Sequence, residues 1–385
     1  MRAAGTVLGA WLTLAGCETV GGDVVLLDAP RCSAPLPPAS IPPITVDPHR
    51  AAFFAAHPLP LLVDHGGLVV RNPRIVAVFF GDDPLQRATE ALLQTYGCST
   101  AFREAVAEYG VGDALYERSV VVPAFPDVAG DAGFRTWLQA HWTTFGPLDE
   151  NSVLFVFAPT GRELAPYTCE VFGGYHSWVA PPSMPYAFVN GCARQLSFGA
   201  TALEQRTDVT THELIELALD PALDAWSGLD RPGWADPLRG ESADLCINRP
   251  GPPSYPFATA SAWSNRRARA GLDPCTASDA PFAIAMPRVA VVDVSSGQAY
   301  ADLDVYADDP NARYALSSDA ACVVPQIPPG ATYRDGDSVR VALPLLPGCT
   351  PSDGDAVGFS LFSSEVGVPR TLRSALAITG ARPPQ

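Results

Sequence analysis

The residues best suited to chemistry lie in one short segment, from Thr211 to Pro221, which reads THELIELALDP. Proline cannot continue a helix, so a helix here ends at Pro221, and His212 and Glu216 lie one turn apart on the same face. Most of the other positions in the segment are leucine, isoleucine or alanine, which predicts that the helix is buried. A histidine and a glutamate at this spacing can reach one ion.

If the helix is buried, its glutamates need a compensating positive charge. An ionised carboxylate inside a protein is costly unless it is paired, and no lysine or arginine lies at helical spacing from Glu213 or Glu216. A bound cation meets that need, and the pattern His-Glu-x-x-Glu differs from the zinc motif His-Glu-x-x-His only in its second ligand. We therefore expect Zn²⁺ here, with Glu213 as the base that activates a zinc-bound water. The alternative is a solvated helix edge on which His212 merely packs.

A third ligand is needed, and the segment from Glu241 to Cys246 follows at a suitable distance along the chain. In metallopeptidases of the gluzincin type, a glutamate on a second helix completes the zinc site and an aspartate beyond it orients the helix histidine. By that similarity, we expect Glu241 to be the third ligand and Asp244 to support His212. Asp220, two turns from His212, is the competing ligand. An acidic site with one imidazole also suits Ca²⁺ or Mn²⁺.

One further histidine lies in a loop-like segment between two cysteines. His176 follows Gly173, Gly174 and Tyr175. We expect a structural loop histidine at this position, with an additional metal ligand or a substrate contact as the alternative.

The overall composition argues against several other functions. The 385 residues include 25 basic and 41 acidic side chains, and the formal charge of −16 repels phosphate backbones, so we expect no nucleic acid partner. The chain contains no lysine, which excludes Schiff-base chemistry and a P-loop. No Gly-x-Ser-x-Gly elbow is present either, so a hydrolase triad of the α/β type has no support.

The N-terminus resembles the signal of a bacterial lipoprotein. After Met1 and Arg2, an apolar stretch too short to span a bilayer ends in Leu-Ala-Gly-Cys at residues 14–17, which resembles the lipobox whose cysteine is acylated. Residues 1–17 are therefore predicted to be a lipoprotein signal peptide with a membrane anchor at Cys17; an ordinary cleaved signal is the alternative. The expected location is the bacterial cell envelope, as an outer-membrane lipoprotein facing the periplasm or the cell surface.

The other eight cysteines are an even number, which suits an oxidising compartment. From their proximity along the chain we expect three disulfides, with Cys32 and Cys98 left over. The expected pairs are Cys169–Cys192, Cys246–Cys275 and Cys322–Cys349.

Behind the signal, the chain divides into three further predicted parts. Proline interrupts residues 18–60, which predicts an extended tether. In residues 61–280, strand-like runs such as Ile75–Phe80 alternate with helix-like segments such as Ser99–Tyr109. We predict an α/β zincin-like domain with a buried HExxE helix. Residues 283–380 contain short apolar runs separated by Gly, Pro and Asp, the pattern of an antiparallel β-sandwich.

Several segments together resemble the phosphate-induced protein 1, or Exordium-like, family and its bacterial relatives. The resemblance covers about Leu61 to Cys275, and the plant members are secreted proteins linked to growth responses, so it implies export. The matching segments are Asp64–Gly67, Asn72-Pro73, Gly174–His176, Tyr186-Ala187, His212–Glu216, Asp220-Pro221, Ala225-Trp226 and Glu241–Cys246.

Two functions are consistent with these patterns. The leading prediction is a lipid-anchored, metal-dependent hydrolase acting on a peptide-like bond, in which His212, Glu216 and Glu241 bind Zn²⁺ and Glu213 is the base. The alternative is a non-catalytic cell-surface module, in which the same cluster holds a structural ion and the C-terminal region binds a peptide or glycan.

Overall fold

The computed structural model describes the chain mainly from Pro58 onward. The described residues are 32, 44, 58–164, 169, 173–180, 184–192, 201–230, 240–246, 257–275, 282–288, 291–294, 299–307, 309, 311–320, 322–348, 356–363, 370–371 and 374–379. The predicted signal peptide, the predicted lipid anchor at Cys17 and nearly all of the predicted tether lie outside them.

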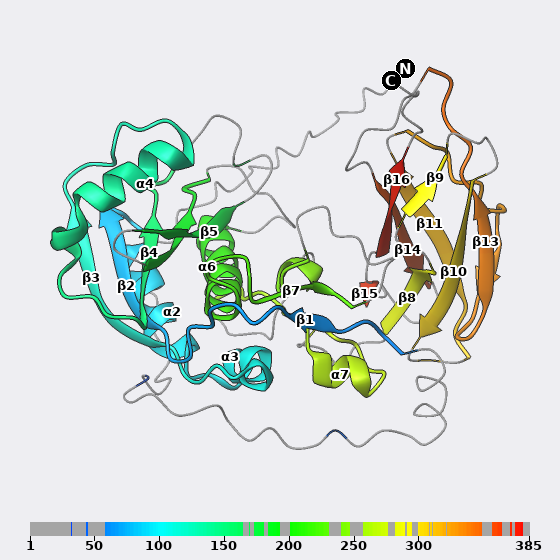
Figure 1. The fold of residues 1–385 in the computed structure, drawn as a ribbon, viewed down its shortest axis with the longest axis horizontal. Helices are drawn as coiled ribbons and strands as arrows, with labels where there is room; N and C mark the ends of the chain where they lie inside the picture. Colours follow the sequence, from blue (N-terminus) through cyan, green and yellow to red (C-terminus); the bar gives the residue numbers. More distant parts are fainter. Residues whose placement is uncertain are drawn as a thin grey trace, which may run out of the picture.

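A five-stranded sheet organises the N-terminal half of the described chain (Figure 1). The strand order is β3-β2-β4-β6-β5; β3, β2, β4 and β6 run parallel, and β5 is antiparallel to β6. The strands are β2 (Arg74–Phe80), β3 (Leu115–Val122), β4 (Ser152–Phe157), β5 (Gly174–Val179) and β6 (Met184–Val189). The strand predicted at Ile75–Phe80 is thus confirmed as β2, the second strand from one edge.

Helices cover both faces of this sheet because its central strands are apolar on both faces. Alternate residues of β2 enter different core clusters, with Ile75 and Phe79 on one side and Val76 and Phe80 on the other. On the first side lie α2 (Gln86–Tyr96), α3 (Thr100–Val106) and α6 (Ala202–Leu219), and on the second side lie α4 (Gly130–Ala140) and the turn η2 (Trp142–Phe145). The sheet is therefore covered on both faces.

The helix predicted at Ser99–Tyr109 is confirmed, with both of its ends as expected. The Ser99 hydroxyl accepts a hydrogen bond from the Phe102 N–H, which caps α3. A 3₁₀ turn, η1 (Ala107–Tyr109), continues the helix to Gly110, whose φ of 86° is a left-handed conformation that suits glycine.

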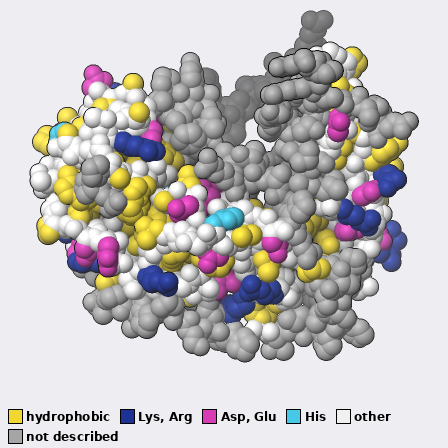
Figure 2. All heavy atoms as spheres, viewed as in Figure 1, with side chains coloured by type: hydrophobic (Ala, Val, Ile, Leu, Met, Phe, Trp, Pro, Cys, Tyr) yellow, Lys and Arg dark blue, Asp and Glu magenta, His cyan; other side chains and the backbone are white. Residues whose placement is uncertain are grey.

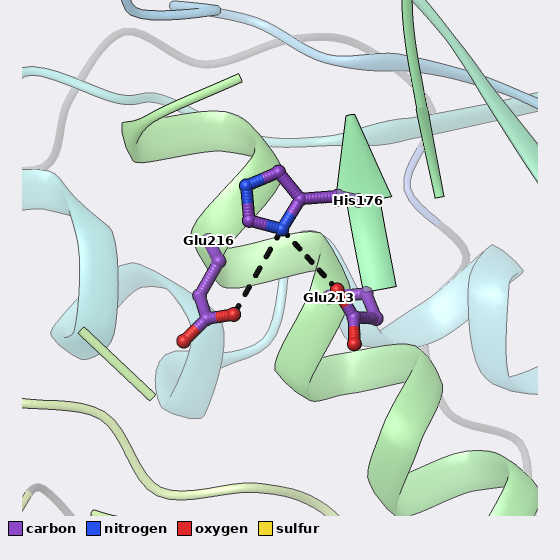
Figure 3. Close-up of side chains that lie close together, drawn as sticks. All are labelled: His176, Glu213 and Glu216. Carbon is purple, nitrogen blue, oxygen red and sulfur yellow. Dashed lines mark hydrogen bonds and ion pairs between the residues drawn. The ribbon is translucent and has the colours of Figure 1, made fainter. Parts of the chain in front are cut away.

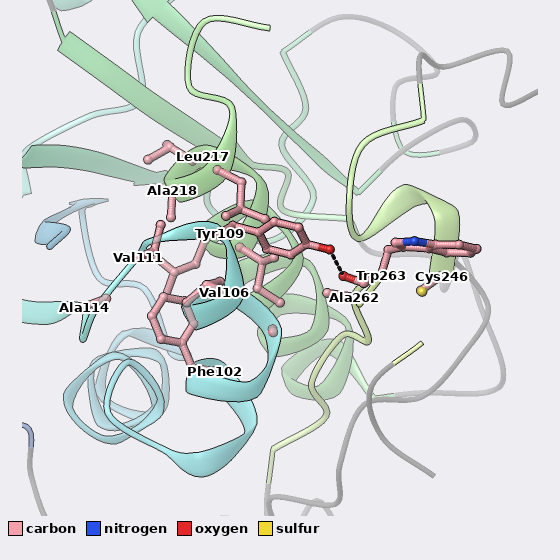
Figure 4. Close-up of a cluster of buried hydrophobic side chains, with 14 of the residues drawn as sticks. Phe102, Val106, Tyr109, Val111, Ala114, Leu217, Ala218, Cys246, Ala262 and Trp263 are labelled. Carbon is pink, nitrogen blue, oxygen red and sulfur yellow. Dashed lines mark hydrogen bonds between the residues drawn. The ribbon is translucent and has the colours of Figure 1, made fainter. Parts of the chain in front are cut away.

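Short elements that come before β2 or after α6 in the chain pack against this core. These elements are β1 (Leu62–Asp64), which pairs with β7 (Trp226–Leu229), the turn η3 (Asp244–Cys246) and α7 (Asn265–Arg269). Figure 4 shows one contact between the turn η1 and the segment before α7: the Tyr109 hydroxyl donates a hydrogen bond of 2.8 Å to the carbonyl of the buried Trp263.

Two further sheets form the C-terminal region, at the right of Figure 1. They have the orders β13-β10-β8-β15 and β12-β11-β14-β16-β9, and each combines antiparallel pairs with one parallel pair, β15 with β8 and β16 with β9. The strands are β8 (Phe282–Pro287), β9 (Val291–Asp293), β10 (Tyr300–Ala307), β11 (Tyr314–Ala320), β12 (Thr332–Tyr333), β13 (Ser338–Ala342), β14 (Ala356–Phe362), β15 (Arg370–Thr371) and β16 (Ser374–Thr379). Ile284, Met286 and Tyr306 of these sheets belong to the same core cluster as β2 and α6.

The predicted fold class, a zincin-like α/β domain with a buried HExxE helix followed by an antiparallel sandwich, is wrong. The structure is a mixed α/β protein with several sheets, in which a largely parallel sheet precedes two sheets of mixed direction. The sequence pattern gives the alternation of strands and helices. It does not give strand order or direction, which depend on pairing between segments far apart in the chain.

Three disulfides join described cysteines: Cys32–Cys98, Cys169–Cys192 and Cys246–Cys275. The latter two confirm the prediction, but the prediction that Cys32 and Cys98 are left over is wrong, since folding brings together cysteines 66 residues apart. Cys322 is also disulfide-bonded, whereas its predicted partner Cys349 lies outside the described residues. The disulfides indicate an oxidising compartment.

Among the residues that the structure describes, no helix combines the length and apolar composition needed to cross a bilayer.

Arginine in the described chain is paired in two different environments. Arg206 on α6 donates to Asp83 at 2.6 Å, and both side chains are buried. On the C-terminal sheets, Arg340 pairs with Asp302 at 2.7 Å and Arg288 with Asp304 at 2.6 Å, all at least partly open to water. Figure 2 shows such alternating basic and acidic side chains at the right of the molecule.

We expect Asp83→Asn to lower the free energy of unfolding by about 3–5 kcal/mol, because it leaves the buried guanidinium of Arg206 without its counter-charge. Urea unfolding followed by tryptophan fluorescence measures the change. The matched control is Asp302→Asn in the exposed pair, for which we expect less than about 1 kcal/mol. Equal losses in the two variants would contradict the assignment of Arg206–Asp83 as a buried pair.

Candidate metal centre

Side-chain hydrogen bonds fix the start of helix α6 and the turn that follows its end. At its start, the Thr201 hydroxyl accepts from the Glu204 N–H while the Glu204 carboxylate accepts from the Thr201 N–H. At its end, Asp220 Oδ1 accepts from the N–H groups of Asp224 and Ala225, at 2.6 and 2.7 Å. Asp220 is therefore a turn-forming residue in this structure.

Strand β5 approaches α6 closely because it begins with glycine. A Cβ atom on Gly174 would lie 2.6 Å from Val209 Cγ1 of α6 and 2.8 Å from the Phe188 carbonyl oxygen. A larger residue would have to displace the Val209 side chain and the backbone of β6. Two positions further along β5, His176 is buried against the C-terminal half of α6.

His176, Glu213 and Glu216 form the first of two groups, which we name the inner triad (Figure 3). His176 Nδ1 lies 3.3 Å from Glu213 Oε2 and 3.9 Å from Glu216 Oε2. The side chains of His176, Glu213 and Glu216 are 2%, 5% and 3% exposed, so this triad is closed to solvent.

His212, Glu216 and Asp244 form the second group, the outer triad. His212 Nε2 lies 3.1 Å from Glu216 Oε2 and 3.3 Å from Asp244 Oδ1. The side chains of His212 and Asp244 are 17% and 13% exposed, so this triad can be reached from solvent. Glu216 belongs to both triads.

The segment that carries Glu241 and Asp244 is held against α6 by the other oxygen of Glu216. Glu216 Oε1 accepts from the N–H groups of Ala243 and Asp244, at 3.0 and 2.9 Å. The disulfide Cys246–Cys275 closes the end of the same segment. The hydrogen bonds to Glu216 and the disulfide thus hold the turn from which Asp244 reaches His212.

Burial and charge compete at the titrating groups of this cluster. Burial alone would lower the pKa of His176, but its contacts with Glu213 and Glu241 raise that pKa well above its ordinary value. Burial would likewise lower the pKa of His212, but the charge of Glu216 and the contact with Asp244 raise that pKa well above its ordinary value. Burial raises the pKa of Glu216 to about 8; His212 opposes this rise, and the charges of Asp244 and Glu241 add to it.

The donor set and its spacing fit a divalent metal ion. Ligand distances of about 2.0–2.2 Å place two ligands of one tetrahedral Zn²⁺ roughly 3.3–3.6 Å apart, and the contacts within the two triads span 3.1–3.9 Å. In addition, Glu241 Oε1 is buried and lies 3.2 Å from His176 Nε2. A carboxylate in this position commonly supports a metal-bound histidine.

The predicted metal ligands do not all meet at one site. His212 and Glu216 meet in the outer triad, but the carboxylate that joins them is Asp244, which was expected only as a supporting residue. Glu241 lies in neither triad; its Oε1 is 3.2 Å from His176 Nε2. The predicted base Glu213 contacts His176 in the inner triad.

His176 is the main member of the cluster that sequence reasoning did not favour. It was expected to lie in a loop, but it lies in β5, paired opposite Ala187 of β6. It is separated by 37 residues from Glu213, and no spacing motif spans that interval. The glycine pair before Tyr175 was the usable signal, because glycine in a strand marks a close backbone approach.

The Asp64–Gly67 segment, which also carries the family resemblance, does not join the cluster. His65 Nε2 lies 2.9 Å from the Ser227 carbonyl oxygen of β7, outside both triads. A Cβ atom on Gly67 would lie 2.3 Å from the Asp224 carbonyl oxygen. This segment therefore packs on the turn that follows α6.

No protein-family model matches the chain, and the comparison with curated proteins gave no match. The resemblance to the Exordium-like family therefore stays a prediction.

We expect the double substitution Cys246→Ser and Cys275→Ser to weaken Zn²⁺ binding by about 10- to 100-fold, because the turn that presents Asp244 loses one of its two fixed ends. Titration calorimetry with Zn²⁺ measures the change. The control is the pair Cys32→Ser and Cys98→Ser, which removes a disulfide from the end of α2 and leaves both triads intact. Equal affinities in the two double variants would show that the hydrogen bonds to Glu216 hold the turn alone.

Proposed function

We propose that the protein is an exported, metal-dependent hydrolase that acts on a peptide-like bond, with a divalent ion held by His212, Glu216 and Asp244. One observation carries the proposal: these three residues offer ligand atoms at metal-binding spacing where His212 and Asp244 reach solvent. Three protein ligands with an open side are typical of catalytic zinc sites, whereas structural sites are closed.

Each residue of the outer triad has a separate part in this proposal. Glu216 supplies Oε2 to the ion while its Oε1 stays bonded to two backbone N–H groups, which fixes the carboxylate plane. His212 and Asp244 approach from α6 and from the turn at 244–246. A divalent ion bound there would polarise a carbonyl group as a Lewis acid. Zn²⁺ is the expected ion; Mn²⁺ and Ca²⁺ also suit a donor set rich in carboxylates.

The expected part of Glu213 as proton acceptor is not included in this proposal. Its carboxylate lies against His176 Nδ1, and Glu213 is outside the outer triad. A base acts within hydrogen-bond reach of the proton that it accepts, and the described geometry directs Glu213 to His176 instead.

A second function has its own supporting observation. The inner triad is almost fully buried, which is typical of an ion that stabilises a fold. In that case the protein is a non-catalytic surface module with a structural ion, and its C-terminal sheets bind a peptide or glycan.

For location, we propose export to the bacterial cell envelope and anchoring in the outer membrane through an acylated Cys17. The disulfides support the oxidising compartment. The anchor rests on the lipobox-like sequence alone.

We expect Asp244→Asn to reduce both Zn²⁺ affinity and hydrolysis of a peptidase substrate panel by at least about tenfold, because one ligand loses its charge. Calorimetry and turnover of fluorogenic peptides measure the two effects. Asp224→Asn, on the turn after α6 but outside both triads, is the control and should change neither. Tight ion binding by the wild type without turnover on any substrate would favour the surface module.

We expect Cys17→Ser to move the protein from the membrane fraction to the aqueous fraction of a bacterial host and to abolish labelling by a palmitate analogue. The control is Cys32→Ser, which alters a cysteine that is disulfide-bonded in the structure. Retention of the label by Cys17→Ser would contradict the proposed anchor.

A further inference from the structure

We infer that the cluster binds two divalent cations, one in each triad, with Glu216 Oε2 as the shared ligand. The inference rests on the proposed function for its outer ion and adds a second ion at His176, Glu213 and Glu216. It is carried by four features: the geometry of Glu216, the hydrogen bonding of His176, the contact of Glu241 with His176 and the charge of the cluster.

Glu216 is the residue that makes sharing feasible. Its Oε1 is occupied by two backbone N–H donors, so only Oε2 faces the histidines. That atom lies 3.1 Å from His212 Nε2 and 3.9 Å from His176 Nδ1. A carboxylate oxygen has two lone pairs, so Oε2 can serve an ion on each side.

The inner triad has the surroundings of a metal-bound histidine. His176 Nε2 lies 3.1 Å from the Asp220 carbonyl oxygen, to which an Nε2–H donates. With the proton on Nε2, Nδ1 is left as a ligand atom, and it faces Glu213 Oε2 at 3.3 Å. A ligating imidazole commonly donates its other N–H in this way to a carbonyl or carboxylate.

Glu241 contacts the other edge of the same imidazole. The residue is 9% exposed, and its Oε1 lies 3.2 Å from His176 Nε2. A carboxylate beside the N–H of a ligating imidazole is a common arrangement, and an ion on Nδ1 would make that N–H more acidic and strengthen its interaction with Glu241.

The balance of charge in the cluster also favours two ions over one. Five carboxylates surround the two histidines, and within the described residues no arginine pairs with any of them: Glu213, Glu216, Asp220, Glu241 and Asp244. When both histidines bind metal as neutral imidazoles, they no longer compensate these charges; one divalent ion then neutralises two of them and two ions neutralise four. Uncompensated charge in a buried site is costly, so the second ion relieves what the first leaves.

A second ion gives Glu213 and His176 a part in the proposed hydrolysis. Glu213 binds the inner ion instead of accepting a proton, and His176 holds that ion away from solvent. Two-metal sites occur in aminopeptidases as well as in phosphatases; at a peptide-like bond, where the leaving atom is nitrogen, a second ion would help to stabilise the charge that develops on the attacking oxygen and the carbonyl oxygen. The substrate class of the proposal, a peptide-like bond, is unchanged.

Metal stoichiometry tests this inference without any substrate. The full chain is stripped with a chelator, loaded with Mn²⁺, desalted and analysed by elemental mass spectrometry. We expect about two Mn²⁺ per wild-type chain, about one in His176→Gln, Glu213→Gln and Asp244→Asn, and binding weakened at both sites in Glu216→Gln. Glu108→Gln, which alters a carboxylate outside the cluster, is the control and keeps about two.

A spectroscopic measurement on the wild type tests the inference even if a variant fails to fold. Electron paramagnetic resonance of the Mn²⁺-loaded wild type should show exchange coupling between two ions, because they share a ligand atom. One uncoupled ion, kept in Glu213→Gln and lost in Asp244→Asn, overturns the two-ion inference and leaves the proposed function standing. One ion lost in Glu213→Gln but kept in Asp244→Asn overturns both, and so does the absence of any bound ion, which would leave a network of protonated histidines.

Discussion

The negative charge buried along the C-terminal half of α6 is the constraint on which the site depends. Glu213 and Glu216 lie in a helix whose neighbouring positions are apolar and fully buried, so neither carboxylate can turn to water. The surrounding structure answers this charge at each point: two imidazoles from β5 and α6, and two backbone N–H groups from the turn at 243–244. The rest of the fold positions these groups.

The position of the cluster differs from the usual binding site of an α/β sheet. Ligands of such sheets commonly bind at the carboxyl ends of the parallel strands, where the strand order reverses. Here the cluster lies beside β5, the antiparallel edge strand, and beneath the last turns of α6. A segment downstream of α6 packs at this place and contributes Glu241 and Asp244.

The sequence predicts the parts of this site that follow local periodicity, and not those that depend on strand pairing. The helix, the spacing of His212 and Glu216, and two of the disulfides are local or nearly so. The register of β5 against β6, which buries His176, comes from contacts between segments that no short motif links. Asp244 takes the place predicted for Glu241 for a similar reason: the hydrogen bonds to Glu216, between segments far apart in the chain, decide which carboxylate faces His212.

The covalent closure at Cys246–Cys275 has a consequence for how the protein matures in the cell. Asp244 is presented by a turn that this disulfide closes, and disulfides form after a chain leaves the reducing cytoplasm. Complete assembly of the outer triad is thereby tied to the redox state of the chain: under reducing conditions the turn that carries Asp244 keeps only its hydrogen bonds to Glu216.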